Sequence, residues 1–207
     1  MAAPLLRVDG LRKRYTRGLL NPEVTFSLSA DFTVDGPGVV GVMGPNGSGK
    51  TTLFELITGG NAPTAGRVLV AGQDIHAVRY RERDRLAIHY HQSYQVRSFK
   101  RTKPAFMMER ASSESPRVHL FDEPQFNTQD GYIGFMLDFF RRLRANGRLV
   151  FLCLHPNEPF HVDILRESCE RFIYVHKGQL THAGSFDALL ADERVRAYLG
   201  RLAPDVR

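Results

Sequence analysis

Residues 44–51 read Gly-Pro-Asn-Gly-Ser-Gly-Lys-Thr, a complete match to the phosphate-loop pattern G-x-x-x-x-G-K-[ST]. The wholly apolar run 39–43 before this stretch predicts a buried strand, and residues 51–58 after it predict a helix. Glycines allow backbone N–H groups to curl around phosphate oxygens, and the start of a helix adds its positive dipole end. We therefore expect Lys50 to reach the β- and γ-phosphates of a nucleotide and the Thr51 hydroxyl to bind Mg²⁺.

A second motif, VHLFDE at residues 118–123, places two carboxylates at the end of an apolar strand. Such carboxylates are costly to bury unless they perform a task. Asp122 is expected to hold Mg²⁺ through its water shell, and Glu123 to polarise an attacking water as a general base. The alternative is an ordinary helix cap or loop acid.

Length and composition set the broad class of the protein. The 207 residues suit one domain, and 43% hydrophobic with 24% charged residues is the balance of a soluble globular chain. Two cysteines, Cys153 and Cys169, cannot form a disulfide framework, which favours a reduced compartment. No apolar run is long enough to span a bilayer and the first residues lack the pattern of a secretory signal, so we expect a cytoplasmic protein.

The net charge of +6 raises the question of a nucleic-acid partner. The densest basic stretch has arginines at 79, 81, 83 and 85, but Glu82 and Asp84 interrupt it. That alternation favours a solvated face, so no nucleic acid is expected as a partner.

Strands and helices alternate along the chain, which predicts an α/β fold with a mostly parallel sheet. The expected strands are 5–8, 24–28, 32–34, 39–43, 67–70, 86–90, 118–121 and 149–154. The expected helices are 51–58, 131–146, 160–167 and a last helix that Ser185 caps and that runs toward residue 199, with a hairpin at Lys177-Gly178 before it.

The stretch GPNGSGKTT at 44–52, together with Asp122-Glu123-Pro124, resembles the ATP-binding cassette (ABC) ATPases, the motor subunits of ABC transporters. This resemblance implies one ABC-type nucleotide-binding domain over residues 1–207, with a mostly parallel core sheet and an N-terminal antiparallel β subdomain. It implies ATP and Mg²⁺ as cofactors. The nucleotide-binding residues it implies are Tyr15, Gly44, Pro45, Asn46, Gly47, Ser48, Gly49, Lys50, Thr51 and Thr52.

Three further roles follow from the resemblance. Tyr15 matches the aromatic that stacks on adenine, although an ordinary strand tyrosine is an equal alternative. Gln92 matches the glutamine that touches Mg²⁺ and the attacking water and senses the membrane partner. His155 follows a predicted buried strand and matches the switch histidine that contacts the γ-phosphate, against the alternative of a structural histidine.

The chain departs from the family pattern after Gln92. Only 29 residues separate Gln92 from Asp122, which is too few for the family's helical subdomain, and the LSGGQ signature occurs nowhere in the chain. Residues 92–117 are therefore expected to be a shortened remnant of that subdomain. A homodimer would have two incomplete sites, whereas a heterodimer with a signature-bearing cassette would have one complete site.

The resemblance implies an ATPase subunit of an ABC-type membrane complex, held at the inner face of the membrane by membrane-spanning subunits and paired with a second cassette. The alternative is a nucleotide-gated regulatory or assembly subunit with little or no hydrolysis. Cassette proteins that act in translation or DNA maintenance usually show paired cassettes or long coiled-coil insertions, and this sequence has neither. A small-molecule kinase is disfavoured, because Glu123 and His155 suit the activation of water better than the activation of a substrate hydroxyl.

Two other histidines, His89 and His91, alternate along a predicted strand and so share a face. Two histidines alone do not make a zinc site, and no cysteine or acid at ligand spacing joins them in the sequence. Ordinary core or loop roles are expected for both.

Overall fold

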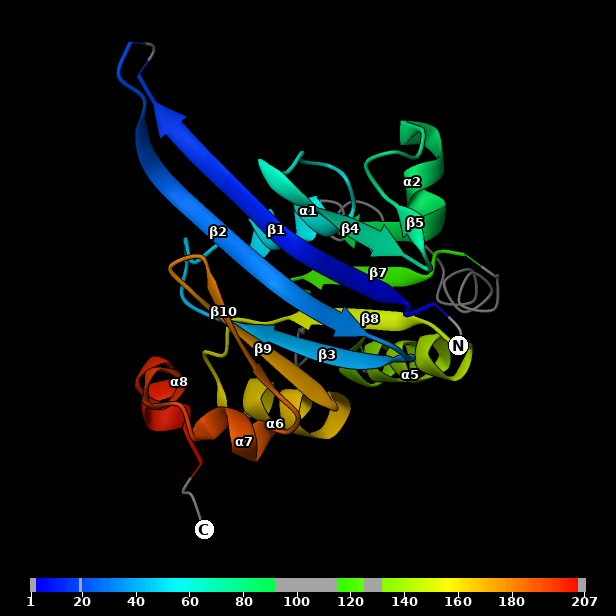
Figure 1. The fold of residues 1–207 in the computed structure, drawn as a ribbon. Coiled ribbons are helices and arrows are strands. Elements are labelled where there is room, and N and C mark those ends of the chain that lie inside the picture. The colour runs from blue at the N-terminus through cyan, green and yellow to red at the C-terminus, as the bar shows by residue number, and fades with distance from the viewer. Residues whose placement is uncertain (1–2, 19, 92–114, 125–131, 205–207) are drawn as a thin grey trace.

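The computed structural model describes residues 3–18, 20–91, 115–124 and 132–204. Within these residues the strands form two sheets (Figure 1). Sheet A is antiparallel and has the order β2-β1-β4-β5. Its strands are β1 (Leu6–Arg17), β2 (Glu23–Val34), β4 (Ala65–Val70) and β5 (Gln73–Asp74).

Sheet B has the order β10-β9-β3-β8-β7-β6 and is the mostly parallel sheet that the sequence predicts. Its five neighbouring strands from β9 to β6 run parallel, and β10 pairs antiparallel with β9. The strands are β3 (Gly38–Met43), β6 (Ala87–Tyr90), β7 (Val118–Asp122), β8 (Leu149–Cys153), β9 (Arg171–His176) and β10 (Gln179–Ala183). The predicted hairpin at Lys177-Gly178 joins β9 to β10.

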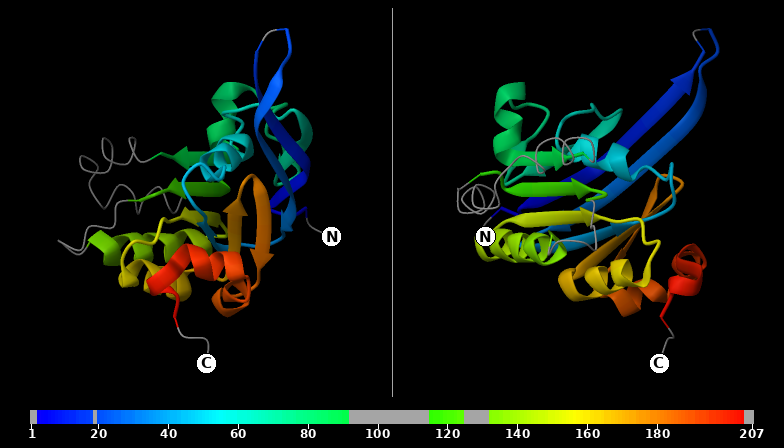
Figure 2. Two further views of the ribbon diagram at one scale, coloured as in Figure 1. Left: turned by 90° about the vertical axis from the view of Figure 1, so that its left-hand side faces the viewer. Right: turned by 180° about the vertical axis from the view of Figure 1, so that it is seen from behind.

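Sheet B is covered on both faces, which explains why its central strands are continuous apolar runs. Helix α1 (Lys50–Ile57) and sheet A cover one face (Figure 2), and Val40 and Val42 of β3 belong to the core on that side. Residues Val39 and Met43 of the same strand belong to a second core. The helices of that second core are α5 (Tyr132–Ala145), α6 (Pro159–Ser168), α7 (Phe186–Leu190) and α8 (Glu193–Leu199), which the 3₁₀ turn Gly200–Leu202 follows.

Two predicted elements differ from the structure. The predicted strands 24–28 and 32–34 are parts of one strand, β2, because it pairs with β1 along nearly its whole length in a long hairpin that projects from the molecule (Figure 1). The predicted last helix is two helices. Ser185 caps α7 by accepting the N–H of Ala188 at 3.1 Å, and Asp192 caps α8 by accepting the N–H of Arg194 at 2.9 Å.

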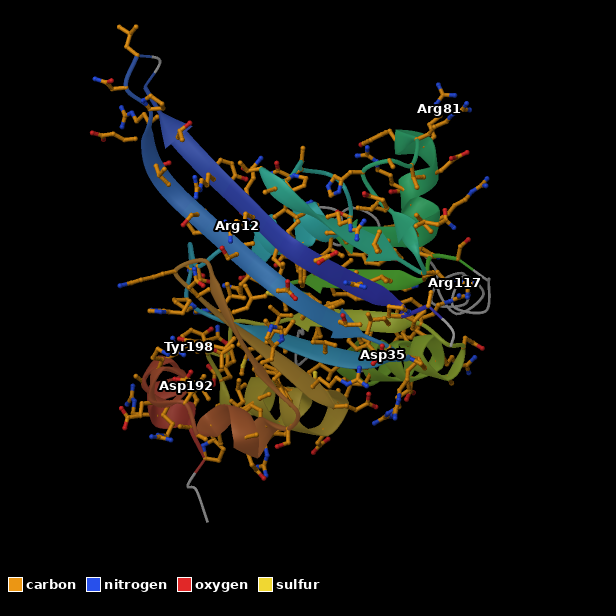
Figure 3. All side chains as sticks on the ribbon, viewed as in Figure 1. Arg12, Asp35, Arg81, Arg117, Asp192 and Tyr198 are labelled. Carbon is orange, nitrogen blue, oxygen red and sulfur yellow. The ribbon has the colours of Figure 1, made fainter. Side chains whose placement is uncertain are left out.

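The arginine-rich stretch forms a helix that the sequence analysis did not predict, α2 (Tyr80–Leu86). Arg81 and Arg85 are exposed, as expected of a solvated face, and Arg81 points away from the molecule (Figure 3). Arg83 is different, because its guanidinium donates to the backbone carbonyls of Gly59 and Val78 and so ties α2 to the end of α1. Among the described helices, none is both long enough and apolar enough to cross a bilayer.

Candidate functional site

The phosphate loop, residues 44–49, lies between the carboxyl end of β3 and the start of α1, as the sequence predicts. The carboxyl ends of β8, β7 and β6 lie at the same edge of sheet B, because these strands are parallel to β3 in the order 3-8-7-6. In open α/β sheets this edge is where ligands bind. Candidate residues from four separate segments therefore meet at one place.

Backbone contacts fix the shape of the loop. Gly44 has φ 149°, and a Cβ at this position would overlap the carbonyl oxygen of Val175 in β9. The β9–β10 turn supports the far side of the loop, because the N–H of Gly178 donates to the carbonyl of Ser48 at 2.9 Å. A Cβ on Gly178, which has φ 73°, would overlap the Ser27 carbonyl oxygen. Glycine is required at both positions by close backbone approach as well as by φ.

Two polar groups of the loop are arranged for an anion. The Lys50 ammonium is buried and donates to the carbonyl oxygens of Gly44 and Pro45, at 2.7 and 3.0 Å. The Ser48 hydroxyl is also buried, and it has no hydrogen-bond partner among the residues that the structure describes. Buried hydroxyls are normally satisfied, so this one is a donor left over for a phosphate oxygen. The loop residues therefore fit a nucleotide phosphate.

Thr51 and Asp122 meet as the predicted Mg²⁺ pair. The Thr51 hydroxyl donates to Asp122 Oδ2 at 2.9 Å, although the two residues are 71 positions apart. Burial raises the pKa of Asp122, but the contacts with His89, Thr51 and Cys153 outweigh it and leave the pKa below its usual value. A carboxylate beside a hydroxyl supplies the oxygen ligands that Mg²⁺ prefers.

Glu123 follows Asp122 with a left-handed backbone, φ 48°, which is uncommon for a residue with a side chain. Its N–H donates to the carbonyl of Cys153 at the end of β8, at 3.0 Å, and this bond holds the turn in place. Strained backbone of this kind clusters at functional sites. The neighbouring Cys153 thiol is fully buried, and burial together with the charge of Asp122 raises its pKa, so it is not a nucleophile.

His155 lies just beyond β8 and is exposed. Its Nδ1 shares a hydrogen bond of 2.9 Å with the hydroxyl of Tyr198 in α8, and the two rings pack edge to face (Figure 3 labels Tyr198). Burial raises the pKa of Tyr198, while the Gly44 backbone acts in the opposite direction. The tyrosine therefore stands between the histidine and the phosphate loop. Nothing local to α8 distinguishes this tyrosine from a packing residue, so its contact with His155 is not predictable from the sequence.

Tyr15 lies in β1 opposite Phe26 of β2. The Phe26 ring covers Gly49, since a Cβ there would come within 2.8 Å of it, and the Tyr15 ring centroid is 6.2 Å from that of Phe26. The Tyr15 hydroxyl accepts a hydrogen bond from Asn61 Nδ2 at 2.6 Å, and Lys13 Nζ lies 5.1 Å from the Tyr15 ring centroid. The structure thus places Tyr15 one aromatic ring away from the phosphate loop.

The other predicted residues divide into two groups. Asn46 and Gly47 are exposed at the tip of the loop, and Thr52 is half-buried in the first turn of α1. Gln92 lies outside the described residues, as does all of the predicted remnant 92–117 before residue 115.

The expectation that no acid joins His89 and His91 is wrong. One ligand atom from each histidine and one from Asp122 lie within 4.8 Å of one another. The sequence could not show this, because Asp122 comes from the neighbouring strand β7 and the parallel pairing of β6 with β7 brings it alongside. This cluster sits beside Thr51 and widens the polar site.

Comparison with known proteins agrees with this geometry. The family model described as "ABC transporter" matches residues 29–105. The phosphonates import ATP-binding protein PhnC of Nitratidesulfovibrio vulgaris is 43% identical over 74 residues, which are 36% of this chain and 26% of that protein. The lipoprotein-releasing system ATP-binding protein LolD of Xylella fastidiosa is 38% identical over 86 residues, which are 42% of this chain and 35% of that protein. The chain thus spans only about a quarter to a third of the length of these relatives.

A third relative extends along nearly the whole chain. The lipopolysaccharide export system ATP-binding protein LptB of Acidithiobacillus ferridurans is 26% identical, and the match covers 95% of this chain and 97% of that protein. That alignment runs over 247 positions, more than the 207 residues present here, so the relative has residues that this chain lacks.

Solved structures show the same fold. A nucleotide-free ATP-binding cassette from an ABC transporter superposes with a TM-score of 0.68 at 18% identity, over 95% of this chain and 98% of that one. An Atm1-family ABC exporter with ATP bound gives a TM-score of 0.71 at 18% identity, over 98% of this chain and 42% of that one. These structures show that the chain has the fold of the ATP-binding cassettes, and the "ABC transporter" family model matches the part of it that holds the phosphate loop.

Proposed function

We propose that this chain is the ATP-binding and ATP-hydrolysing subunit of an ABC-type membrane transport complex, acting as one nucleotide-binding domain. The observation that carries the proposal is the hydrogen bond of 2.9 Å between Thr51 and Asp122 beside the buried Lys50 ammonium. A cation, a hydroxyl and a carboxylate at the carboxyl edge of a parallel sheet fit the phosphates of a nucleotide and their divalent ion.

The loop residues each have a task in binding. On nucleotide binding, Lys50 exchanges the carbonyls of Gly44 and Pro45 for β- and γ-phosphate oxygens, and Ser48 donates its spare hydroxyl proton to a phosphate. Thr51 and Asp122 would hold Mg²⁺, which neutralises charge on the phosphates when bound. Tyr15, with Lys13 over its ring, offers a face for the adenine base.

Hydrolysis requires a group that accepts a proton from the attacking water, and we assign this role to Glu123, which directly follows Asp122. His155 contacts the γ-phosphate in this proposal, and its hydrogen bond to Tyr198 orients the imidazole. Gln92, which lies outside the described residues, would contact Mg²⁺ and the attacking water and sense the membrane partner, the role that the resemblance implies for it. The lowered pKa of Asp122 favours the carboxylate form, which is the form that would bind Mg²⁺.

The partners are membrane-spanning subunits and a second cassette. PhnC and LptB are named as ATP-binding proteins of an import and an export system, and LolD as one of a lipoprotein-releasing system. We extend that setting to this chain, which places it at the cytoplasmic face of a membrane through its partners. Because its sequence carries no LSGGQ, the second cassette supplies that signature in a heterodimer.

The missing LSGGQ signature also favours one alternative function. Without its own signature, the chain could bind ATP with little or no turnover and act as a nucleotide-gated regulatory or assembly subunit. The intact Glu123 and His155 favour hydrolysis over this alternative.

The test compares the ATPase rate of the purified chain with that of the complex that co-purifies with it from membranes. We expect activity in the complex, loss of ATP binding in Lys50→Ala, and a fall of about 100-fold or more in turnover with retained ATP binding in Glu123→Gln. Glu167→Gln, an exposed glutamate in α6, is the matched control and should behave as wild type. ATP binding without turnover in either sample would establish the alternative, and an unchanged rate in Glu123→Gln would remove its role as base.

A further inference from the structure

The strands β6 and β7 bring two imidazoles and a carboxylate together beside the phosphate loop. His89 and His91 lie two positions apart and share a face of β6 and its continuation, and Asp122 ends β7 alongside. His89 Nε2 is 3.4 Å from Asp122 Oδ2, and the two imidazole ring centroids are 3.6 Å apart. One ligand atom from each of the three side chains lies within 4.8 Å of the other two.

The surroundings of His89 indicate that this arrangement serves a ligand. Its side chain is only 6% exposed, Nδ1 has no hydrogen-bond partner in the part of the chain that the structure describes, and Nε2 approaches Asp122 Oδ2 only to 3.4 Å. Buried imidazoles are normally hydrogen-bonded, so a buried ring with one unpartnered nitrogen and one long contact to a carboxylate is costly without a ligand. The Phe54 ring of α1 packs edge-on against the imidazole, with centroids 5.4 Å apart, and holds it toward Asp122.

The distances and the donor atoms suit a transition-metal ion. Two ligands on a tetrahedral ion with bonds near 2.1 Å are separated by about 3.4 Å, the separation of His89 Nε2 from Asp122 Oδ2. Imidazole nitrogen selects ions of the zinc, cobalt and nickel class, whereas Mg²⁺ prefers oxygen. Asp122 can accept the Thr51 hydroxyl and still bind a metal, because a carboxylate has about four lone-pair positions.

We propose that His89, His91 and Asp122 form a three-ligand site for a divalent transition-metal ion of the zinc class. Three protein ligands leave a coordination position open to water or to a phosphate oxygen, the arrangement of a site that engages substrate. This proposal rests on the proposed function only through Asp122, which serves both sites. The chain would thus carry an imidazole-based ion position next to its oxygen-based Mg²⁺ position.

The test titrates the nucleotide-free full chain with Co²⁺, read by its visible d–d absorption, and then displaces Co²⁺ with Zn²⁺. We expect one Co²⁺ per chain in a four- or five-coordinate spectrum without a thiolate charge-transfer band. His91→Ala removes an exposed ligand and should weaken binding by at least about tenfold, because losing even an outer-shell partner of a metal costs that much. His182→Ala, in β10, is the matched control and should bind as wild type.

Three results would overturn the site: equal affinity in His91→Ala and wild type, no stoichiometric Co²⁺ binding, or a thiolate band, which would place the ion at a cysteine. Circular dichroism and thermal unfolding of His91→Ala separate lost ligation from lost folding. Two measurements distinguish failure of the metal site from failure of the proposed function: Co²⁺ binding by Lys50→Ala, and ATP binding by the wild type with Mg²⁺. Lys50→Ala should still bind Co²⁺, and a chain that binds Co²⁺ but no ATP would refute the proposed function alone.

Discussion

A buried histidine in β7 should make the stability of this protein fall at mildly acidic pH. His119 is 3% exposed, its Nδ1 shares a hydrogen bond of 3.2 Å with the Tyr90 hydroxyl, and its ring stacks with those of Tyr90 and Phe121. Burial first, and then the positive charge of Arg148, lower the pKa of His119 from 6.5 to about 3, against a smaller opposite effect of the Pro116 backbone.

The sign and size of the effect follow from proton linkage. The unfolded chain binds a proton at His119 below pH 6.5, whereas the folded chain does not until about pH 3. The free energy of unfolding therefore decreases as pH falls through this window, by about 1.4 kcal/mol for each pH unit well inside it. Between pH 7 and pH 5 the single histidine accounts for about 2 kcal/mol of lost stability.

Urea unfolding at pH 7 and pH 5 measures this loss in the wild type and in His119→Gln. The constant cost of replacing the imidazole cancels when each variant is compared with itself at the two pH values. We expect the pH-dependent loss to be about 2 kcal/mol smaller in His119→Gln, and unchanged in the control His176→Gln, whose side chain is partly exposed. Equal losses in His119→Gln and wild type would refute the reasoning.

Three further predictions concern the site. Gly178→Ala should weaken binding of a fluorescent ATP analogue, because the new methyl group would overlap the Ser27 carbonyl and move the turn off the phosphate loop. Gly184→Ala, with open space at its Cβ, is the control. Equal affinity in the two variants would contradict the prediction. Tyr198→Phe keeps the ring but loses the hydrogen bond to His155, so kcat should fall while KM and the melting temperature change little; a lower melting temperature with unchanged kcat would show a purely structural tyrosine. Asp122→Asn should raise the Mg²⁺ concentration needed for half-maximal hydrolysis, and an unchanged Mg²⁺ titration would exclude Asp122 as a ligand.

The sequence predicted those parts of the site that depend on neighbouring residues. The order strand, glycine-rich loop, helix around Lys50 is local, and the wholly buried β3 follows from its unbroken apolar run. The partnership of Thr51 with Asp122 was also predictable, because both motifs end up at the carboxyl edge of one parallel sheet.

What the sequence did not predict depends on register between distant strands and on helix docking. The grouping of Asp122 with His89 requires β6 to lie directly beside β7 in parallel register, and no local pattern specifies a neighbouring strand. The contact of Tyr198 with His155 requires α8 to dock against the end of β8, which depends on the packing of the second core. Side chains that meet only through tertiary structure leave no periodic signal in the sequence.

The hydrogen bond from Gly178 to Ser48 has a consequence for the order of events during synthesis. The phosphate loop lies in the first quarter of the chain, yet the turn that supports it and the strand that contacts Gly44 are translated about 130 residues later. A growing chain that ends before β9 has the complete phosphate-binding motif but no support on that side of the loop. Nucleotide can therefore act as a reporter of finished folding, because its binding site is assembled only after the carboxyl-terminal hairpin has joined the sheet.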